Sequence, residues 1–310
     1  MRSLIIHNPN SGFGSDAIYE FARMLIAPGD ECCFRLLGPD DAPDNMLSDA
    51  EEFDIVVLSG GDGTVSNMLY CLANRGVICC VFPSGAANRF YANIGNAFEP
   101  AALARACKAK TTALIDLGEI SWTDAEGVEH TRGFSLMSGM GYDAQLMRAA
   151  IPNKQSMGQA AYFAAVLSEP DVSRAEFTIA IDGQEFKHTG ITCMVADTAT
   201  LQGDVDLVPN CRLDDGLLDI IMAESSNVGE LARPLFAGIL DRRGKKLGRP
   251  TFVHRRGANI EVRCSIPLPL EIDGDAIDGL VTGYRARILK GAIRIIVDPS
   301  SPYYPTADAQ

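Results

Sequence analysis

The sequence predicts an α/β fold, in which an N-terminal parallel-sheet domain is followed by a C-terminal antiparallel β-sandwich domain. Three observations lead to this prediction. Apolar strand-like runs alternate with helical stretches over residues 1–118, short alternating segments dominate the remainder, and glycine-rich loops follow the early strands. Strands that alternate with helices form parallel sheets, whereas many short strands separated by turn residues form sandwiches.

The first part of the chain reads as a series of strands and helices. Because the carboxyl ends of parallel strands lie at one edge of a sheet, the loops that follow the first, third and fourth strands should meet there. The expected strands are 3–8, 32–37, 54–59, 77–82 and 112–117, the expected helices are 15–27, 65–74, a stretch from 87 and 99–108, and the three loops are 8–14, 59–64 and 83–88.

The pattern changes after about residue 119, where turn signals separate short alternating segments. We therefore expect an α/β domain at 1–118, to which 298–310 returns, and a β-sandwich domain at 119–297. The expected strands are 134–138, 176–182, 190–196, 217–223, 259–264, 269–273, 285–289 and 293–297, with helical insertions near 156–168 and 228–241 and a disordered tail from 300.

Composition limits the class of protein. The chain has 310 residues, is 47% hydrophobic and 22% charged, and is long enough for two folded domains. No apolar run approaches the ~20 residues of a membrane span, and the N-terminal apolar run is too short for a signal peptide. Nine cysteines without a Cys-x-x-Cys pair are expected to be reduced thiols. These features predict a cytoplasmic protein.

Charge is distributed unevenly along the chain. The net charge of −13 argues against a nucleic-acid binder. Residues 242–256, however, contain seven Lys or Arg residues and no acidic residue. A solvated loop is the plain interpretation. The functional interpretation is that this segment binds an anionic bilayer, because each basic residue contributes ~1 kcal/mol near such a surface. Peripheral membrane association is therefore an expectation.

The motif Gly60-Gly61-Asp62-Gly63-Thr64 lies between a predicted buried strand and a predicted helix. A strand that ends in glycines and leads into a helix leaves backbone N–H groups facing outward, where they can hold phosphate. Glycine is needed because a Cβ atom would block the close approach of the anion. A carboxylate there would repel phosphate unless Asp62 holds a metal, orients a water or takes up a proton. The residues suggest a nucleotide–Mg²⁺ site.

Two further loops have a similar composition. Asn8-Pro9-Asn10-Ser11-Gly12 follows the first predicted strand, and Pro83-Ser84-Gly85 follows the fourth. Each alone is also typical of a turn, but three such loops at one sheet edge favour a phosphate site. The dinucleotide pattern G-x-G-x-x-A occurs at both 12–17 and 139–144, and two matches in unrelated contexts show how little it discriminates. An NAD-type Rossmann domain is disfavoured.

Several aspartates have two readings. Asp273-Gly274-Asp275 is typical of a hairpin turn, yet a tight turn would let both carboxylates point into one site. Asp116 closes a predicted strand, and Asp215 precedes a glycine. A cap or a turn is the plain role for each of these two, and a cation site is the alternative.

Six segments stand in an order and spacing that are together specific. They are Asn8-Pro9-Asn10-Ser11-Gly12, Gly60-Gly61-Asp62-Gly63-Thr64, Pro83-Ser84-Gly85-Ala86-Ala87-Asn88, Ser138-Gly139-Met140-Gly141-Tyr142-Asp143-Ala144, Asp214-Asp215-Gly216-Leu217-Leu218-Asp219 and Asp273-Gly274-Asp275. In these segments the chain resembles the diacylglycerol kinase catalytic-domain family, which also contains sphingosine and ceramide kinases. The resemblance covers nearly the whole length. Gly-Gly-Asp-Gly-Thr alone is shared with NAD kinases.

The resemblance implies a nucleotide-binding domain, a β-sandwich domain and a site in the cleft between them. It implies transfer of the γ-phosphoryl group of ATP to a lipid hydroxyl at a membrane surface, with Mg²⁺ as cofactor. By this likeness Asp62 organises Mg²⁺ and phosphate, Asp116 joins that acidic network, and Asp215 matches a structural cation site. Asp273 is the general base, with Asp275 beside it. Nucleotide contacts are expected from Asn8, Ser11, Gly12, Gly60, Gly61, Gly63, Thr64, Asn67, Ser84, Gly85, Asn88 and Arg89.

The chain departs from the family pattern in three places. The third loop, usually Gly-Thr-x-Asn-Asp, is Gly85-Ala86-Ala87-Asn88-Arg89, Phe13 stands where a Lys often follows the first glycine, and the usual Asp-Gly-Glu is Asp273-Gly274-Asp275. Arg89 could supply the positive charge that Phe13 does not. These departures leave the acceptor open between ceramide or another sphingolipid and diacylglycerol.

The sequence leaves two alternatives to an ATP-dependent lipid kinase. One is a non-catalytic nucleotide- or lipid-binding relative that has lost its metal network. The other is an NAD kinase-like enzyme, which the basic segment and the sandwich motifs disfavour. The sequence leaves a homodimer open.

Overall fold

The computed structural model of the protein describes residues 1–12, 16–142, 144, 174–201, 205–206, 208, 211–223 and 252–305. These residues pack as two compact units. The first unit comprises Met1–Leu117, Leu213–Asp215 and Leu289–Gln310, and the second comprises Gly118–Arg212 and Gly216–Ile288. The predicted helical insertions, Phe13, Asp143, residues 242–251 of the basic segment and the last five residues lie outside the described residues.

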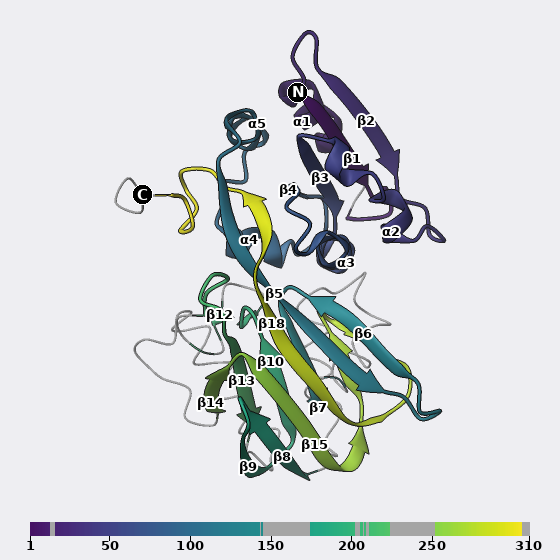
Figure 1. Ribbon diagram of the computed structural model, residues 1–310, viewed down its shortest axis with the longest axis vertical. Helices are drawn as coiled ribbons and strands as arrows, with labels where there is room; N and C mark the ends of the chain where they lie inside the picture. The colour runs from purple at the N-terminus through teal and green to yellow at the C-terminus, as the bar shows by residue number, and fades with distance from the viewer. Residues whose placement is uncertain are drawn as a thin grey trace. The chain divides into compact units, whose positions relative to one another are not determined.

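The first unit contains a parallel sheet whose strands follow the order β2-β1-β3-β4-β18 (Figure 1). The strands are β1 (Arg2–His7), β2 (Glu31–Leu36), β3 (Ile55–Gly60), β4 (Ile78–Pro83) and the end of β18 (Val281–Ile296). Every residue of β3 is buried, as a central strand covered on both faces requires. The expected parallel sheet of the first part is confirmed.

Helices of the first unit present apolar residues to the core. In α1 the buried residues are spaced as on one helical face, and this helix packs against α5. The predicted helix at 65–74 begins earlier, at Asp62, so the last three residues of the glycine motif form its first turn. The helices are α1 (Ala17–Leu25), α2 (Pro43–Met46), the 3₁₀ helix η1 (Ala50–Glu52), α3 (Asp62–Leu72), α4 (Arg89–Ile94) and α5 (Pro100–Ala109).

The second unit contains two main antiparallel sheets. One joins β6, β5, β18, β15, β8 and β9, the other runs β14-β13-β10-β7-β16-β17, and β11 and β12 form a short separate pair. These strands are β5 (Thr112–Thr123), β6 (Glu129–Phe134), β7 (Met137–Gly141), β8 (Ala175–Ile181), β9 (Gln184–Gly190), β10 (Thr192–Ala196), β11 (Thr200–Leu201), β12 (Val205–Asp206), β13 (Leu218–Ala223), β14 (Phe252–Gly257), β15 (Asn259–Leu268), β16 (Leu270–Ile272) and β17 (Asp275–Ala276).

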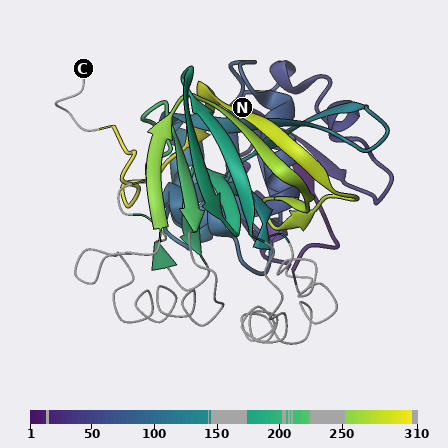
Figure 2. The same ribbon diagram turned by 90° about the horizontal axis from the view of Figure 1, so that it is seen from below.

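Both sheets of the second unit contribute to one apolar core, so this unit is the predicted sandwich (Figure 2). Phe134 and Phe177 come from one sheet, and Met140 and Ile220 from the other. Alternation along β15 places the intervening residues outside. All nine cysteines are free thiols. Among the described residues, no helix is long and apolar enough to cross a membrane.

Several expectations need correction. The strand predicted at 134–138 is two strands, because β6 ends at Phe134 and β7 begins at Met137. The tail predicted to be disordered from residue 300 is described through residue 305, and the Ser301 hydroxyl donates to the Ile94 carbonyl at 2.6 Å.

The strands predicted at 285–289 and 293–297 are one strand, β18, which pairs antiparallel with β15 and then parallel with β4. Residues from Leu289 onward lie in the first compact unit. The strand β9 was not expected, because its residues are mostly polar and exposed. A compact unit does not by itself show that a segment folds on its own. The domain boundaries expected from the sequence therefore remain a prediction.

Candidate functional site

The three glycine loops of the first unit meet at the carboxyl edge of the parallel sheet, as the sequence predicts. The backbone N–H of Asn8 donates to the carbonyl of Ser59 at 2.8 Å. The N–H of Gly61 donates to the Ser11 hydroxyl at 3.1 Å. The Ser59 and Ser84 hydroxyls lie 2.6 Å apart. Each loop is thus tied to another by at least one hydrogen bond.

Close backbone packing explains two of the glycines. A Cβ atom on Gly12 would lie 2.2 Å from the Ser84 carbonyl oxygen, and Gly12 also has a φ of +67°. A Cβ atom on Gly85 would lie 2.5 Å from the Cα of Gly61. Real Cβ atoms do not approach backbone this closely, so only glycine fits at either position. The loops bring glycine-rich backbone close together beside the start of α3, an arrangement of the kind that cradles phosphate.

Two asparagines of the expected site brace the loops. The Asn8 amide donates to the Thr64 hydroxyl at 3.0 Å and so links the first loop to α3. Asn88 has a φ of 50°, which asparagine tolerates better than most residues. Its side chain closes the third loop by accepting from the Gly85 N–H at 2.7 Å and donating to the Gly85 carbonyl at 2.8 Å. These contacts set the loop shape around any ligand.

Asp62 occupies the first turn of α3, where the helix dipole favours a negative charge. One carboxylate oxygen accepts the N–H of Phe90 at 3.0 Å, which links α3 to α4. Arg89 is the first residue of α4 and directly precedes this contact. Asn67 lies about one turn after Thr64 on α3 and is half-buried. The expected nucleotide residues are thus gathered in the first unit.

Asp116 and Asp215 are the other predicted metal residues of the first unit. Asp116 on β5 is buried, its carboxylate accepts the Gly291 N–H at 2.7 Å, and its own N–H donates to the Leu213 carbonyl at 2.6 Å. Asp215 lies half-buried in the turn before Gly216, whose φ is 74°. The hydrogen bonds of Asp116 fit a structural brace, and the position of Asp215 fits a turn. A cation role for either stays a prediction.

No group of three or more metal-type side chains is found within the part of the chain that the structure describes. This does not conflict with magnesium, because Mg²⁺ is usually held by one or two carboxylates together with substrate phosphates and water. Asp62 fits that role, since it stands beside the glycine loops.

In the second unit, Asp273-Gly274 forms the two-residue turn between β16 and β17, with φ values of 50° and 84°. The Asp273 carboxylate accepts three successive backbone N–H groups: Ser135 at 2.9 Å, Leu136 at 2.9 Å and Met137 at 3.1 Å. The turn is therefore fastened to the β6–β7 connection.

Asp275 also has a partner within the second unit. Its carboxylate lies 2.9 Å from an Arg132 guanidinium nitrogen on β6, and its side chain is 54% exposed. Arg132 belongs to none of the sequence motifs. The turn thus presents two carboxylates, but one is held by backbone N–H groups and the other by an arginine.

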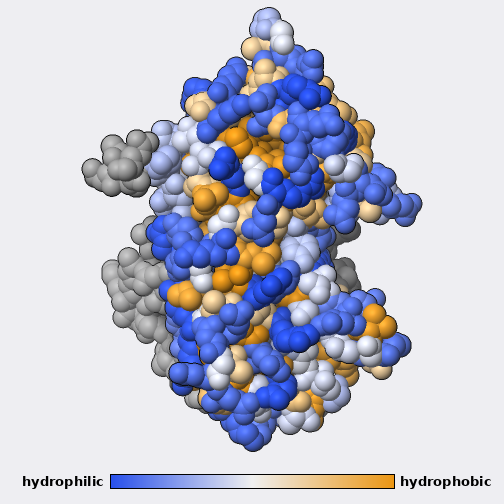
Figure 3. Space-filling model, in the orientation of Figure 1, coloured by the Kyte–Doolittle hydropathy of each residue, from blue (hydrophilic) through white to orange (hydrophobic). Residues whose placement is uncertain are grey.

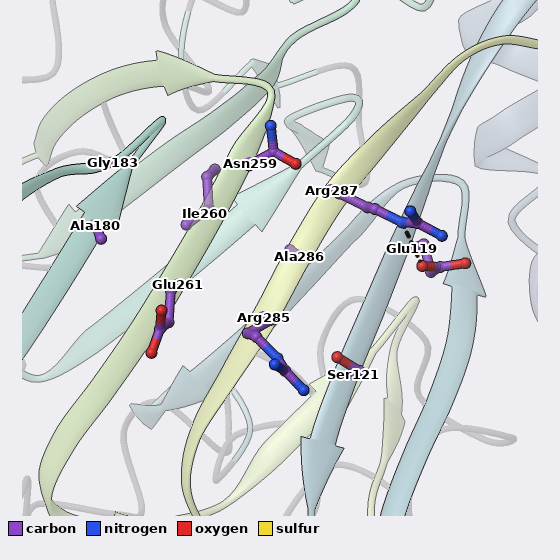
Figure 4. A pocket seen from close by; sticks show the side chains of 10 residues that line it. All are labelled: Glu119, Ser121, Ala180, Gly183, Asn259, Ile260, Glu261, Arg285, Ala286 and Arg287. Atoms are coloured by element: carbon purple, nitrogen blue, oxygen red, sulfur yellow. Dashed lines mark hydrogen bonds and ion pairs between the residues drawn. The ribbon is translucent and has the colours of Figure 1, made fainter.

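A depression of about 450 Å³ lies on the outer face of the large sheet of the second unit. Glu119 and Arg287 face each other there at 2.6 Å (Figure 4). None of the predicted site residues lines it. Hydrophilic and hydrophobic side chains are mixed on the face in Figure 3. The depression is an open, ion-paired sheet surface and does not have the character of a ligand pocket.

Two family models match successive parts of the chain. The diacylglycerol kinase catalytic domain family matches residues 2–120, and the YegS C-terminal NAD kinase beta sandwich-like domain family matches residues 137–297. The chain therefore belongs to the diacylglycerol kinase family. The predicted membership, and with it the enzyme class of lipid kinase, is confirmed.

Individual relatives span most of the chain. A protein named diacylglycerol kinase from Mycobacterium tuberculosis is 30% identical over 234 residues, which are 72% of this chain and 74% of the relative. One from Bacillus subtilis is 25% identical over 236 residues, or 72% of each chain. A crystal structure of a diacylglycerol kinase from Bacillus anthracis str. Sterne has a TM-score of 0.69 at 19% identity, over 97% of this chain and 98% of its own. That structural likeness concerns the fold alone.

Two residues of this edge belong to no motif. His7 is the last residue of β1 and Ser59 the residue opposite it on β3. The signal in the sequence is slight: each is a polar residue at the end of an apolar strand, immediately before a glycine loop.

Proposed function

We propose that the protein is an ATP-dependent lipid kinase, which transfers the γ-phosphoryl group of ATP to a hydroxyl of a lipid. The observation that carries the proposal is the meeting of three loops in the first unit, where Gly12 and Gly85 leave no room for a Cβ atom. Backbone of this kind, beside a helix N-terminus, binds phosphate. The names of the relatives supply the acceptor class.

Magnesium is part of the proposal, with Asp62 as its protein ligand. One oxygen of the Asp62 carboxylate accepts the Phe90 N–H, and we propose that the other contacts a metal ion or its water. Phosphate oxygens would complete the coordination. A bound Mg²⁺ would neutralise charge on the transferred group, while the loops orient the phosphates, which is the main contribution of proteins to phosphoryl transfer.

The acceptor hydroxyl must lose a proton, and Asp273 is the proposed general base. General bases contribute about 10²–10⁴-fold to rate. The three N–H groups of residues 135–137 fix the orientation of this carboxylate. Asp275, paired with Arg132, stands beside it on the next strand.

A non-catalytic relative is the second candidate, and a specific observation favours it. Both carboxylates of the Asp273-Gly274-Asp275 turn already have protein partners, and Arg89 stands where the family usually has an acid. A protein of this kind would bind nucleotide or lipid without turnover.

A panel of acceptors separates these functions. The purified protein is incubated with γ-labelled ATP, Mg²⁺ and, in parallel, diacylglycerol, ceramide, sphingosine or NAD. A labelled lipid phosphate supports the kinase and names its acceptor. ATP binding without any labelled product supports the second candidate, and labelled NAD would contradict both.

The proposal includes reversible binding to anionic bilayers through the basic segment 242–256. In its described part, Arg255 and Arg256 lie on β14; the Arg255 guanidinium stacks over Phe186 at 4.4 Å, and Arg256 lies 2.9 Å from the buried Asp219. Screening over ~8 Å lets a local basic surface act despite the acidic net charge.

Vesicle flotation tests this part of the proposal. Replacing Arg242, Arg243, Lys245 and Lys246 with Ala should weaken binding to anionic vesicles. The control removes four exposed basic residues elsewhere, Arg23, Arg105, Lys108 and Lys290. Equal flotation of the wild type and the first variant would leave the segment a solvated loop.

A further inference from the structure

A chain of hydrogen bonds leads from the core of the first unit to the glycine loops. His7 is 6% exposed. Its Nδ1 atom lies 2.9 Å from the Ser59 hydroxyl oxygen. That oxygen lies 2.6 Å from the hydroxyl of Ser84, in the third loop. The register of the sheet creates this order, because His7 stands opposite Ser59 in the β1–β3 pair.

The buried His7 ring contacts two aromatic side chains. Its edge contacts involve Tyr19 on α1, at 6.1 Å between ring centroids, and Phe34 on β2, at 6.2 Å. A polar ring in such surroundings is costly unless it is hydrogen-bonded. Burial also lowers the pKa of His7 below its usual range, which keeps the imidazole neutral near pH 7. A neutral imidazole carries a hydrogen on only one nitrogen.

The donor-to-acceptor direction of these hydrogen bonds decides whether the Ser84 hydroxyl can donate to a ligand. Each hydroxyl has one hydrogen to donate. If His7 Nδ1 donates to Ser59, Ser59 donates to Ser84, and the Ser84 hydrogen is left for a ligand. In the reverse order, Ser84 donates to Ser59 and Ser59 donates to His7 Nδ1. The Ser84 hydroxyl then offers a ligand only its lone pairs. Since anions require donors, only the first direction makes Ser84 a phosphate ligand.

We propose that His7 is a positioning residue for the phosphate site: it donates from Nδ1 to Ser59 and thereby directs the Ser84 hydroxyl hydrogen toward an oxygen of a polyphosphate held by the glycine loops. This rests on the proposed function, which supplies the polyphosphate. The Ser84 backbone is fixed for the task, because its carbonyl oxygen packs directly on Gly12.

Two substitutions of His7 separate positioning from packing. His7→Phe keeps an aromatic ring against Tyr19 and Phe34 but removes the donor. His7→Asn loses the ring but places an amide near the former Nδ1. We expect the dissociation constant for Mg-ATP to rise about 5-fold in His7→Phe and less in His7→Asn, within the usual range of coupling between neighbouring residues. Thermal stability should follow the opposite order. An affinity order that simply follows stability would overturn the proposal.

A double-mutant cycle measures whether His7 acts through Ser84. In the background of Ser84→Ala, His7→Phe should change the Mg-ATP dissociation constant less than 2-fold, because the last hydroxyl of the hydrogen-bond series is already missing. Ser3→Ala is the control, since Ser3 is a buried serine at the other end of β1; His7→Phe should keep its full effect in that background. Additive effects of His7→Phe and Ser84→Ala would refute the relay. Failure of the wild type to bind Mg-ATP would instead refute the polyphosphate site itself.

Discussion

The carboxylate of Asp62 is held in one orientation at the start of α3 by the Phe90 N–H at 3.0 Å. An Asn in its place can still accept this hydrogen bond, so the contact between α3 and α4 survives the substitution. What the substitution removes is the charge that would face Mg²⁺ and phosphate.

Asp62→Asn should therefore nearly abolish turnover and change the free energy of unfolding by at most about 1 kcal/mol. The control is Asp41→Asn, because Asp41 also accepts one backbone N–H, from Gly38 at 2.7 Å, in the same unit. Chemical denaturation and a kinase assay measure the two effects. Activity of Asp62→Asn above a tenth of the wild type would exclude Asp62 from the metal site.

His7 gives the first unit a pH-dependent stability. Because burial lowers its pKa in the folded protein, the unfolded chain binds more protons below about pH 6.5. The contribution is present above that pH and is lost as the pH falls through the folded pKa. The free energy of unfolding of the wild type should thus fall more between pH 7.5 and 5.5 than that of His7→Phe. Parallel pH profiles of the two proteins would show that His7 titrates normally.

At the scale of elements, the loops depend on close backbone contact. Gly12→Ala should cost about 1–2 kcal/mol for its left-handed backbone and, in addition, displace Ser84. Gly76 is a matched control, because its φ is +72° and an added Cβ would meet nothing within 4 Å. Calorimetry should show similar backbone strain in both variants but loss of Mg-ATP binding only in Gly12→Ala. Unimpaired binding in Gly12→Ala would mean that the loops do not hold the phosphates.

The β16–β17 turn allows a similar comparison. Asp273→Asn replaces one acceptor oxygen by an N–H₂ group facing backbone donors, which should cost about 1–3 kcal/mol. Asp182 is the control: it opens the β8–β9 turn at a φ of 47° and accepts the Asn259 N–H at 2.9 Å. Both variants should be destabilised.

Only Asp273→Asn should lower kcat, and it should lower kcat more than it raises the KM for ATP, since a base acts in the transition state. Steady-state kinetics at a temperature where both variants are folded give this comparison. A loss confined to ATP affinity would assign Asp273 to nucleotide binding.

Local patterns predicted the elements of the first unit well because parallel strands are apolar runs. The predicted element boundaries differ from the observed ones mainly where an element contains polar residues. The helix α3 begins at Asp62 because its carboxylate suits a helix N-terminus, although glycines surround it. The polar strand β9 was not predicted from the sequence. It is a strand because it pairs with β8, and its own residue pattern does not indicate one.

The candidate site was predictable only in part, because partners distant in sequence define it. Three glycine loops could be expected to meet, but the hydrogen bonds of Asp273 to residues 135–137 join segments more than 130 residues apart. The His7–Ser59–Ser84 chain depends on strand register, which no local pattern encodes.

At the scale of the whole molecule, the chain passes between the two units through strands as well as loops. Both β5 and β18 begin in one unit and end in the other. The family relationship covers both units. The proposed kinase mechanism draws on residues of both units, so it is tested on the intact chain.

The most direct test is Mg²⁺-dependent transfer of label from γ-labelled ATP to a lipid by the intact protein. We predict a labelled lipid phosphate from ceramide, another sphingolipid or diacylglycerol, which is lost when EDTA removes Mg²⁺ and is nearly absent with Asp62→Asn. Asp41→Asn should form the same product as the wild type. ATP binding by a folded wild-type protein, with no labelled lipid from any acceptor of the panel, would contradict the account.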